Sequence, residues 1–208
     1  YEGWIDPKQF VKITAVTYAK LNELQYLSGL VVSQPLKIET GEIINLVPGS
    51  SLPLFDGRHL YLADEKYTFT GKAVKPDTGL FTQNIESAAR FYLHTPYLWG
   101  GKSTFGIDCS GLTQMVFKQF GIKIKRDTWQ QAEQGKEVNS LAETKPGDLA
   151  FFDNSEGRII HVGILLNNNE IIHASGRVKI DRIDEKGIYS EELLQYTHKL
   201  RIIKRYHQ

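Results

Sequence analysis

The sequence predicts an α+β protein in which a small all-β module precedes a domain with helices first and an antiparallel sheet afterwards. Short alternating apolar runs fill the first third of the chain, helical spacing of apolar residues follows, and β-rich runs come last. The segment KPDTG at residues 75–79 contains Pro and Gly and separates the first pattern from the others. We therefore expect one domain over residues 1–78 and a second over residues 79–208.

The first module is expected to be a β-barrel built from short antiparallel strands. Its apolar runs are broken by the turn-forming sequences PGSS, DGR and TG, which is typical of small β-structure. The segment LNELQYLSG in its middle indicates a short helix or an irregular insertion. The predicted strands lie in VKITAV, EIINLV, HLYL and KYTFTGKA.

The second domain opens with two predicted helices. NIESAARFYLH has apolar residues at helical spacing, with Asn84 as the expected N-cap. CSGLTQMVFKQFG predicts another helix, which begins near Cys109 and stops at Gly121. Its apolar stripe consists of Leu112, Met115, Val116 and Phe120. The antiparallel sheet is predicted from four β-rich runs, DLAFFDN, RIIHVGILL, EIIHASG and KLRIIK.

Composition excludes several classes of protein. The 25 Lys and Arg residues balance 24 Asp and Glu without long runs, so nucleic acid is not an expected partner. No window approaches the roughly 20 uninterrupted apolar residues of a transmembrane helix, so no membrane span is expected. The first residues lack the features of a signal peptide, and the absence of an initial Met favours removal of a leader or of further N-terminal sequence.

Cys109 is the only cysteine, which excludes an intrachain disulfide and a Cys-rich metal site. Three roles remain for it: a core thiol, an exposed thiol or a nucleophile. The predicted helix places Cys109 in its first turn, where unpaired N–H groups and the macrodipole favour the thiolate, so we expect a lowered pKa. Asp108 could cap the same helix. A thiol that only fills the core would more naturally lie on the apolar stripe, so the position favours a nucleophile.

A nucleophilic cysteine needs a base, and His161 and His173 are the candidates because each interrupts a strongly apolar strand. Residues 167–169 are three consecutive Asn residues, which favour a turn between these strands. A loop of these three residues would place His173 opposite Gly163 and both imidazoles on one face. The same loop shifted back by one residue would place the histidines directly opposite, whereas a two-residue loop without a bulge would separate them.

Two other roles stay open for this pair. The imidazoles could be structural, with hydrogen bonds to the backbone. They could also hold zinc, but the chain has neither HExxH nor CxxC, so scattered carboxylates would have to complete the site. The remaining histidines are expected at the surface: His59, His94, His198 and His207.

The motifs DCSGLTQMVF, KPGDLAFFDN, IIHVGILL and EIIHASG together resemble the NlpC-type cell-wall peptidases, which are papain-like cysteine enzymes of bacteria. The resemblance covers about residues 80–206. It implies a papain-like domain in which Cys109 is the nucleophile, His161 the base and His173 the third polar residue, which orients the base. It also implies that Tyr97, in PYLWGG, lines the active site and assists the oxyanion, and that no metal or organic cofactor is needed.

Residues 1–75, especially YEGWIDPKQF and EKYTFTGKAV, resemble the bacterial SH3-like modules that precede this catalytic domain. The combination resembles the subgroup that cleaves the γ-D-glutamyl-L-diamino acid bond of peptidoglycan stem peptides with a free N-terminal L-Ala. That resemblance implies that Asp108 and Ser110 bind the substrate ammonium, and that Tyr1, unless it only packs beside Trp4, reaches the same pocket. YEGWI resembles the closing strand of such a module, so its opening strands are expected to be missing from this chain.

The resemblance thus implies a cysteine endopeptidase that acts as a monomer on peptidoglycan stem peptides. The identity of the diamino acid, diaminopimelate or lysine, stays open, as does the choice between free peptides and intact wall. A free-amine requirement favours recycling of released peptides, and hence the cytoplasm over the periplasm or cell envelope. The alternatives are a thiol-dependent amidase or acyltransferase of related fold, or a wall-binding module beside an idle catalytic domain.

Overall fold

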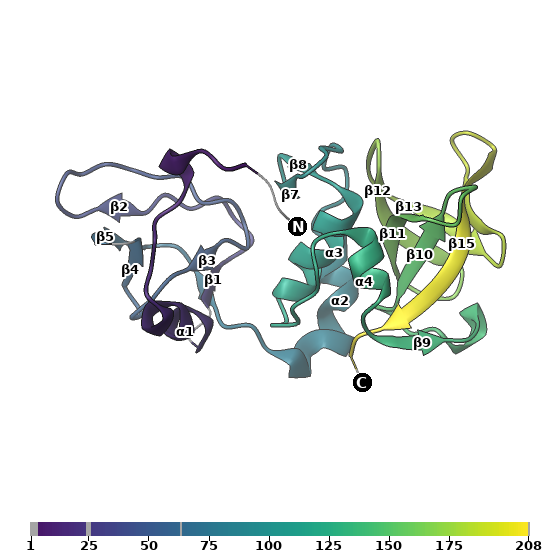
Figure 1. Cartoon of the computed structure of the whole chain (residues 1–208), viewed down its shortest axis with the longest axis horizontal. Helices are drawn as coiled ribbons and strands as arrows, with labels where there is room; N and C mark the ends of the chain where they lie inside the picture. The colour runs from purple at the N-terminus through teal and green to yellow at the C-terminus, as the bar shows by residue number, and fades with distance from the viewer. Residues whose placement is uncertain (1–3, 24–25, 63, 208) are drawn as a thin grey trace. The chain divides into compact units, whose positions relative to one another are not determined.

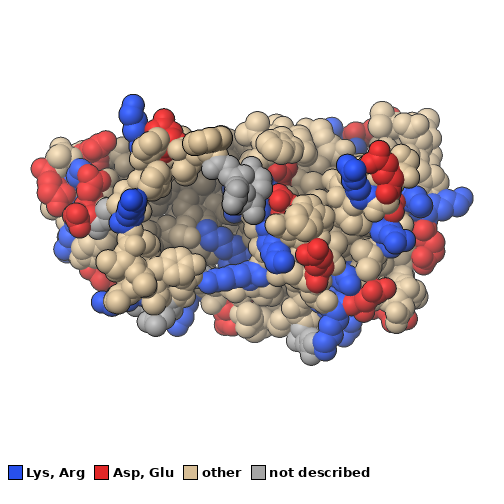
Figure 2. Space-filling model, viewed as in Figure 1, with Lys and Arg blue, Asp and Glu red and all other residues tan. Residues whose placement is uncertain are grey.

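The computed structural model describes residues 4–23, 26–62 and 64–207, and the chain divides into two compact units (Figure 1). The first unit comprises residues 1–76 and the second residues 77–208. No helix in the described part of the chain is both long and apolar enough to cross a membrane. Acidic and basic side chains are both spread over the face shown in Figure 2.

The first unit contains a 3-10 helix at Pro7–Gln9, helix α1 (Ala15–Glu23) and two small antiparallel sheets. One sheet has the strand order β3-β1-β6 and the other β2-β5-β4. Its core is formed by the buried side chains of Leu52, Leu60, Tyr67 and Phe69. The strands are β1 (Tyr26–Ser28), β2 (Leu36–Lys37), β3 (Ser51–Leu52), β4 (His59–Leu62), β5 (Glu65–Thr68) and β6 (Ala73–Val74).

Two predicted strands of this unit were wrong. VKITAV has no regular structure before α1 begins, because the alternating face that includes Val11 and Ile13 is exposed and no strand among the described residues buries it. EIINLV forms only isolated bridges to Ser33 and Leu36. The predicted strand HLYL is confirmed as β4. The SH3-like architecture expected for this unit stays a prediction.

In the second unit the helices come first, as predicted. Helix α2 (Phe81–Arg90) follows a 3-10 turn at Thr78–Leu80 and begins three residues before the expected N-cap. The reason is that the Phe81 ring packs edge-on against Phe117 and Phe120 at centroid distances of 5.3 and 5.1 Å, which draws the first turn into the core. A hairpin of β7 (Lys102–Ser103) and β8 (Gly106–Ile107) then leads into α3 (Cys109–Lys118), which α4 (Thr128–Ala132) follows.

The sheet of the second unit closes into a barrel, where an antiparallel sheet of four runs was predicted. Strands β10 to β15 pair in sequence, and β10 also pairs with β15, so six strands form a ring with β9 added outside it on β15. Closure is possible because the 11-residue β15 pairs with β14 near its start and with β10 further along. The strands are β9 (Lys136–Val138), β10 (Leu149–Asp153), β11 (Ile159–Leu165), β12 (Glu170–Ser175), β13 (Arg177–Asp184), β14 (Gly187–Ser190) and β15 (Gln195–Arg205).

Alternation along the strands divides the apolar residues of this unit into two cores. One face of β11, including Val162 and Ile164, packs with α2 and α3. The opposite face, including Leu165, packs with Phe152 and Ile171 in a second cluster. His161 lies on the same face of β11 as Leu165, which places an imidazole beside that second cluster.

Candidate active site

Cys109 is the first residue of α3, as the sequence predicted. Asp108 is the N-cap, and its carboxylate accepts a 2.6 Å hydrogen bond from the backbone N–H of Gly111. The Cys109 side chain is buried rather than exposed, with a residue exposure of 7%. Backbone N–H groups, among them that of Val162, lower its pKa, which places the thiol beside β11 where His161 lies.

The pKa of Cys109 is nevertheless raised to about 11, so the expected lowering was wrong. Burial is the largest cause, and the charge of Asp108 adds to it. These two effects together are larger than the effect of the N–H groups at the start of the helix. Burial and the nearby carboxylate destabilise the thiolate by more free energy than hydrogen bonds from the helix terminus stabilise it. At neutral pH Cys109 is therefore a neutral thiol that needs a base in order to attack.

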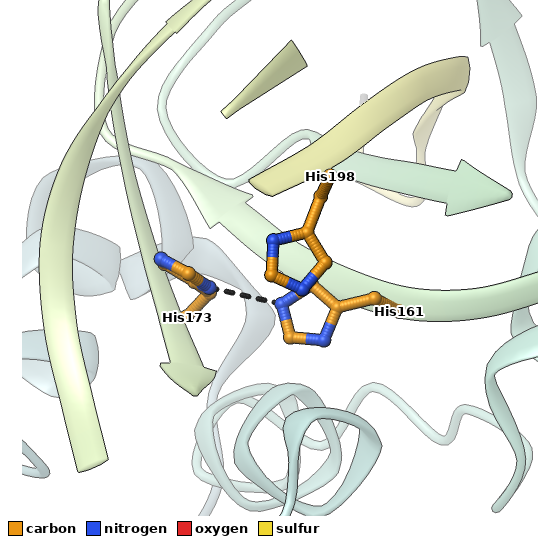
Figure 3. Close-up of side chains that lie close together, drawn as sticks. All are labelled: His161, His173 and His198. Carbon is orange, nitrogen blue, oxygen red and sulfur yellow. Dashed lines mark hydrogen bonds between the residues drawn. The ribbon is translucent and has the colours of Figure 1, made fainter. Parts of the chain in front are cut away.

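The hairpin that carries the two histidines has the predicted three-residue loop. His173 lies opposite Gly163, and the N–H of Leu166 donates to the carbonyl of Glu170 at 3.0 Å. Both imidazoles are buried on one face, and Nε2 of His161 lies 2.9 Å from Nδ1 of His173 (Figure 3). The shifted register, in which the histidines would be directly opposite, is excluded.

Asp181, on β13, extends this pair, and the sequence prediction missed it. Its carboxylate oxygen Oδ2 lies 3.0 Å from Nε2 of His173 and 3.2 Å from the ammonium of Lys179. Burial raises the pKa of Asp181, but the hydrogen bonds from His173 and Lys179 outweigh it and lower the pKa, so the carboxylate is ionised. The available sequence signal was an acidic residue at an inward position of the alternating run RVKIDRID.

The carboxylate of Asp181 fixes the tautomers of both histidines. An ionised carboxylate only accepts, so Nε2–H of His173 donates to Asp181 and Nδ1 of His173 keeps a lone pair. That lone pair accepts the Nε2–H of His161, which leaves the lone pair of His161 on Nδ1, the nitrogen turned away from His173 in Figure 3. Burial is the main reason why the pKa of His161 lies well below its ordinary value, and repulsion from His173 and His198 when they are protonated lowers it further. The ring is neutral and its Nδ1 can accept a proton.

His198 also belongs to this cluster, so its expected place at the surface was wrong. Its ring stacks on that of His161, with centroids 4.1 Å apart and planes 25° from parallel (Figure 3). His198 is on β15 and lies opposite Ile188 of β14, and its Nδ1 is 2.8 Å from Oγ1 of Thr197. Burial lowers its pKa to about 4. The prediction failed because the segment near the C-terminus is not a free end: β15 is long and continues well past His198 as a strand of the barrel.

Asp108 does more than cap α3. Its two oxygens accept from both terminal nitrogens of Arg126, at 3.1 and 2.6 Å, and from the N–H of Gly100 at 2.7 Å. Nη1 of Arg126 also donates to Oγ of Ser110 at 2.6 Å. Burial raises the pKa of Asp108, but the hydrogen bonds from Arg126, Gly111 and Gly100 lower it overall. Arg126, which the sequence prediction missed, therefore already neutralises the carboxylate expected to bind an ammonium group.

Tyr97 lies at the edge of the same region. It forms a parallel bridge with Ile107, two residues before Cys109, and 39% of the residue is exposed. Burial raises the pKa of its phenol first, and the charges of Cys109 and Asp108 raise it further, so the hydroxyl lies within their electrostatic reach. Tyr1, the remaining predicted site residue, lies outside the described residues.

Several known proteins are similar to this chain in sequence. A family model described as the NlpC/P60 family matches residues 94–197. Gamma-D-glutamyl-L-lysine dipeptidyl-peptidase of Bacillus subtilis (strain 168) is 41% identical over 116 residues, which cover 53% of this chain and 38% of that protein. Dipeptidyl-peptidase 6 of Lysinibacillus sphaericus is 29% identical over 226 residues, covering 93% of this chain and 78% of the relative.

A solved structure shows the same fold over nearly the whole chain. The crystal structure of an NlpC/P60 family protein from Bacillus cereus ATCC 10987 superposes with a TM-score of 0.76 at 23% identity, covering 99% of this chain and 70% of that one. This chain spans well under half the length of the Bacillus subtilis relative. The family model matches half of the sequence, from residue 94, ahead of α3, to residue 197 near the start of β15, and the chain belongs to the NlpC/P60 family.

Proposed function

We propose that this chain is a cysteine peptidase that cleaves peptidoglycan stem peptides. The observation that carries the proposal is the hydrogen-bonded chain from Asp181 through His173, which leaves a lone pair on Nδ1 of His161. The helix-terminal thiol of Cys109 has a hydrogen bond with the backbone of Val162, the residue that follows His161 on β11. The relatives from Bacillus subtilis and Lysinibacillus sphaericus, both named as dipeptidyl-peptidases, support a peptidase. We assign Cys109 as the nucleophile, His161 as the general base and His173 as the residue that orients it.

The reaction starts with Cys109 as a neutral thiol and His161 as a neutral imidazole. Nδ1 of His161 takes the proton of the Cys109 thiol as the sulfur attacks the carbonyl carbon, and the ring becomes an imidazolium stabilised by His173 and ionised Asp181. Backbone N–H groups at the start of α3, together with the Tyr97 hydroxyl, stabilise the oxyanion. The imidazolium then protonates the leaving amine, and the same ring later activates the water that releases the acyl group from sulfur.

We further propose that the cleaved bond is the γ-D-glutamyl bond to an L-diamino acid, in peptides with a free N-terminal L-Ala. The name of the Bacillus subtilis relative supports a γ-D-glutamyl-L-lysine bond. Recognition of the ammonium group by Asp108 and Ser110 has to accommodate Arg126, which contacts both side chains. An incoming ammonium would share the carboxylate with this guanidinium or displace it.

Product analysis with defined peptides tests both levels of the proposal. The parent protein and Cys109→Ala are incubated with L-Ala-γ-D-Glu-L-Lys, its diaminopimelate counterpart and N-acetylated versions of each, and the products are identified by mass spectrometry. The parent should release L-Ala-γ-D-Glu from the free-amine peptides only. Cys109→Ala should fold, by circular dichroism, without turnover. Turnover by Cys109→Ala would refute the nucleophile, and cleavage of acetylated peptides would refute the free-amine requirement alone.

A further inference from the structure

Three histidine side chains from three strands of the barrel converge at one place. His161 on β11, His173 on β12 and His198 on β15 each offer one ring nitrogen, and these nitrogens all lie within 4.8 Å of one another (Figure 3). Within the described residues, no other group of three or more His, Cys, Asp or Glu side chains comes together in this way. The cluster has more imidazoles than the proposed peptidase mechanism uses, since His198 has no part in it.

Three imidazoles are a ligand set that suits zinc. Zn²⁺ prefers four tetrahedral ligands with Zn–N distances of about 2.0–2.1 Å, and a site of three histidines leaves the fourth position to water. Its ligand nitrogens are then roughly 3.3 Å apart, which lies between the 2.9 Å that joins His161 to His173 and the 4.8 Å limit of the cluster. His198 would have to turn out of its stack on His161, and it is the most exposed of the three.

Neighbouring residues already determine which nitrogen two of the rings can offer to a metal. Asp181 accepts from Nε2 of His173, so Nδ1 is the nitrogen left for a metal, and a carboxylate partner of this kind raises the basicity of a histidine ligand. Thr197 contacts Nδ1 of His198, which leaves Nε2 of that ring as its ligand atom. Two of the three ligands therefore have the hydrogen-bonded supports that histidines in metal sites have.

We propose that Zn²⁺ binds reversibly to His161, His173 and His198 and inhibits the protein. To become a ligand, Nε2 of His161 releases its proton to water and Nδ1 takes up one proton from water, so the imidazole stays neutral and no net proton is released. Nδ1 of His161 then carries a hydrogen and cannot accept the Cys109 proton. No oxidation or reduction takes place. The binding site stands on the geometry alone, whereas the inhibition rests on the proposed peptidase function.

Binding is measured on the full chain by calorimetry with zinc chloride and by the visible absorption of bound Co²⁺, neither of which needs activity. The parent and Cys109→Ala should each bind one ion with equal affinity. His198→Phe, which keeps an aromatic ring on His161 without a ligand atom, should bind at least about 100-fold more weakly. His59→Phe is the matched control, because His59 belongs to the first unit and is not a member of the cluster, and it should bind as the parent does. If His198→Phe does not fold, His198→Asn replaces it.

Inhibition is measured separately, as the fraction of each variant's own peptide turnover that remains with added Zn²⁺. The parent should lose turnover near the zinc concentration that half-saturates it and regain it with EDTA, while His198→Phe retains its turnover at that concentration. Equal zinc affinity of His198→Phe and the parent would overturn the proposal, as would loss of binding in Cys109→Ala, which would make the thiol the ligand. If the parent cleaves no peptide, the proposed function fails, and the binding measurements still decide the metal site.

Discussion

Two buried carboxylates on either side of the proposed site have opposite kinds of partner. Asp181 contacts His173, whose ring contacts His161, so this carboxylate holds a row of titratable groups in one tautomeric state. Asp108 contacts Arg126, a permanently charged group, together with backbone N–H groups. The Asp181–His173–His161 arrangement can take up and release a proton. The Asp108–Arg126 arrangement only holds two opposite charges together and fixes the loop that contains Gly100. The difference indicates that the half with Asp181 determines the rate, whereas the half with Asp108 determines stability and substrate placement.

The largest effect is expected where the proton is transferred. His161→Ala should lower kcat/KM for a stem peptide by about 10⁴-fold, because the neutral Cys109 thiol then has no base. Steady-state kinetics with His59→Ala as a histidine control should show full activity for the control. A loss of less than tenfold in His161→Ala would place the base elsewhere.

Removing the charge of Asp181 should have the next largest effect. Asp181→Asn no longer fixes the tautomer of His173, so His161 spends part of its time with a hydrogen on Nδ1, and kcat should fall by about 10²-fold with KM nearly unchanged. Asp181→Glu, which keeps the charge, should recover part of the rate. A rise of KM at constant kcat would assign Asp181 to substrate binding instead.

Breaking the ion pair between Asp108 and Arg126 should lower the stability of the fold. Arg126→Met leaves the buried Asp108 carboxylate without its charged partner and should lower the free energy of unfolding by about 2 kcal/mol at pH 7. Arg158→Met removes an ion pair with Glu156 in which both side chains are exposed, and it should cost less than about 0.5 kcal/mol in the same urea titration. Equal effects of the two substitutions would show that the Asp108 pair contributes no more than an ordinary surface pair.

The stability difference should also depend on pH. The pKa of Asp108 is lowered in the folded state from an ordinary value of 3.8, so the ion pair stabilises the fold fully above that value and less as the pH falls through the folded pKa. Urea titrations of the parent and Arg126→Met should therefore converge at low pH. A constant difference from pH 7 to pH 2 would exclude the carboxylate as the cause.

Local patterns in the sequence predicted the parts of the site that depend on neighbouring residues. The start of α3 at Cys109 followed from capping and the apolar stripe, and the face shared by His161 and His173 followed from the odd loop at residues 167–169. The four residues of the predicted apolar stripe, Leu112, Met115, Val116 and Phe120, are all buried. These predictions needed only the pitch of a helix and the alternation of a strand.

Contacts between distant segments could not be predicted in this way. Arg126 meets Asp108 across 18 positions, and His198 meets His161 only because β15 closes the barrel onto β10. The pKa of Cys109 was mispredicted because the helix terminus is visible in the sequence, whereas the burial that outweighs it is not. Barrel closure and desolvation both arise from the assembled fold.

The pH dependence of Cys109 alkylation tests the central claim, a neutral thiol and a neutral His161, most directly. With excess iodoacetamide, and with only one cysteine in the chain, the rate of mass increase reports the thiolate fraction of this residue alone. A pKa near 11 predicts a rate that rises about tenfold per pH unit between pH 7 and pH 9, without a plateau. A rate already at its plateau at pH 7 would show a thiolate and imidazolium pair in the resting protein and would contradict the account.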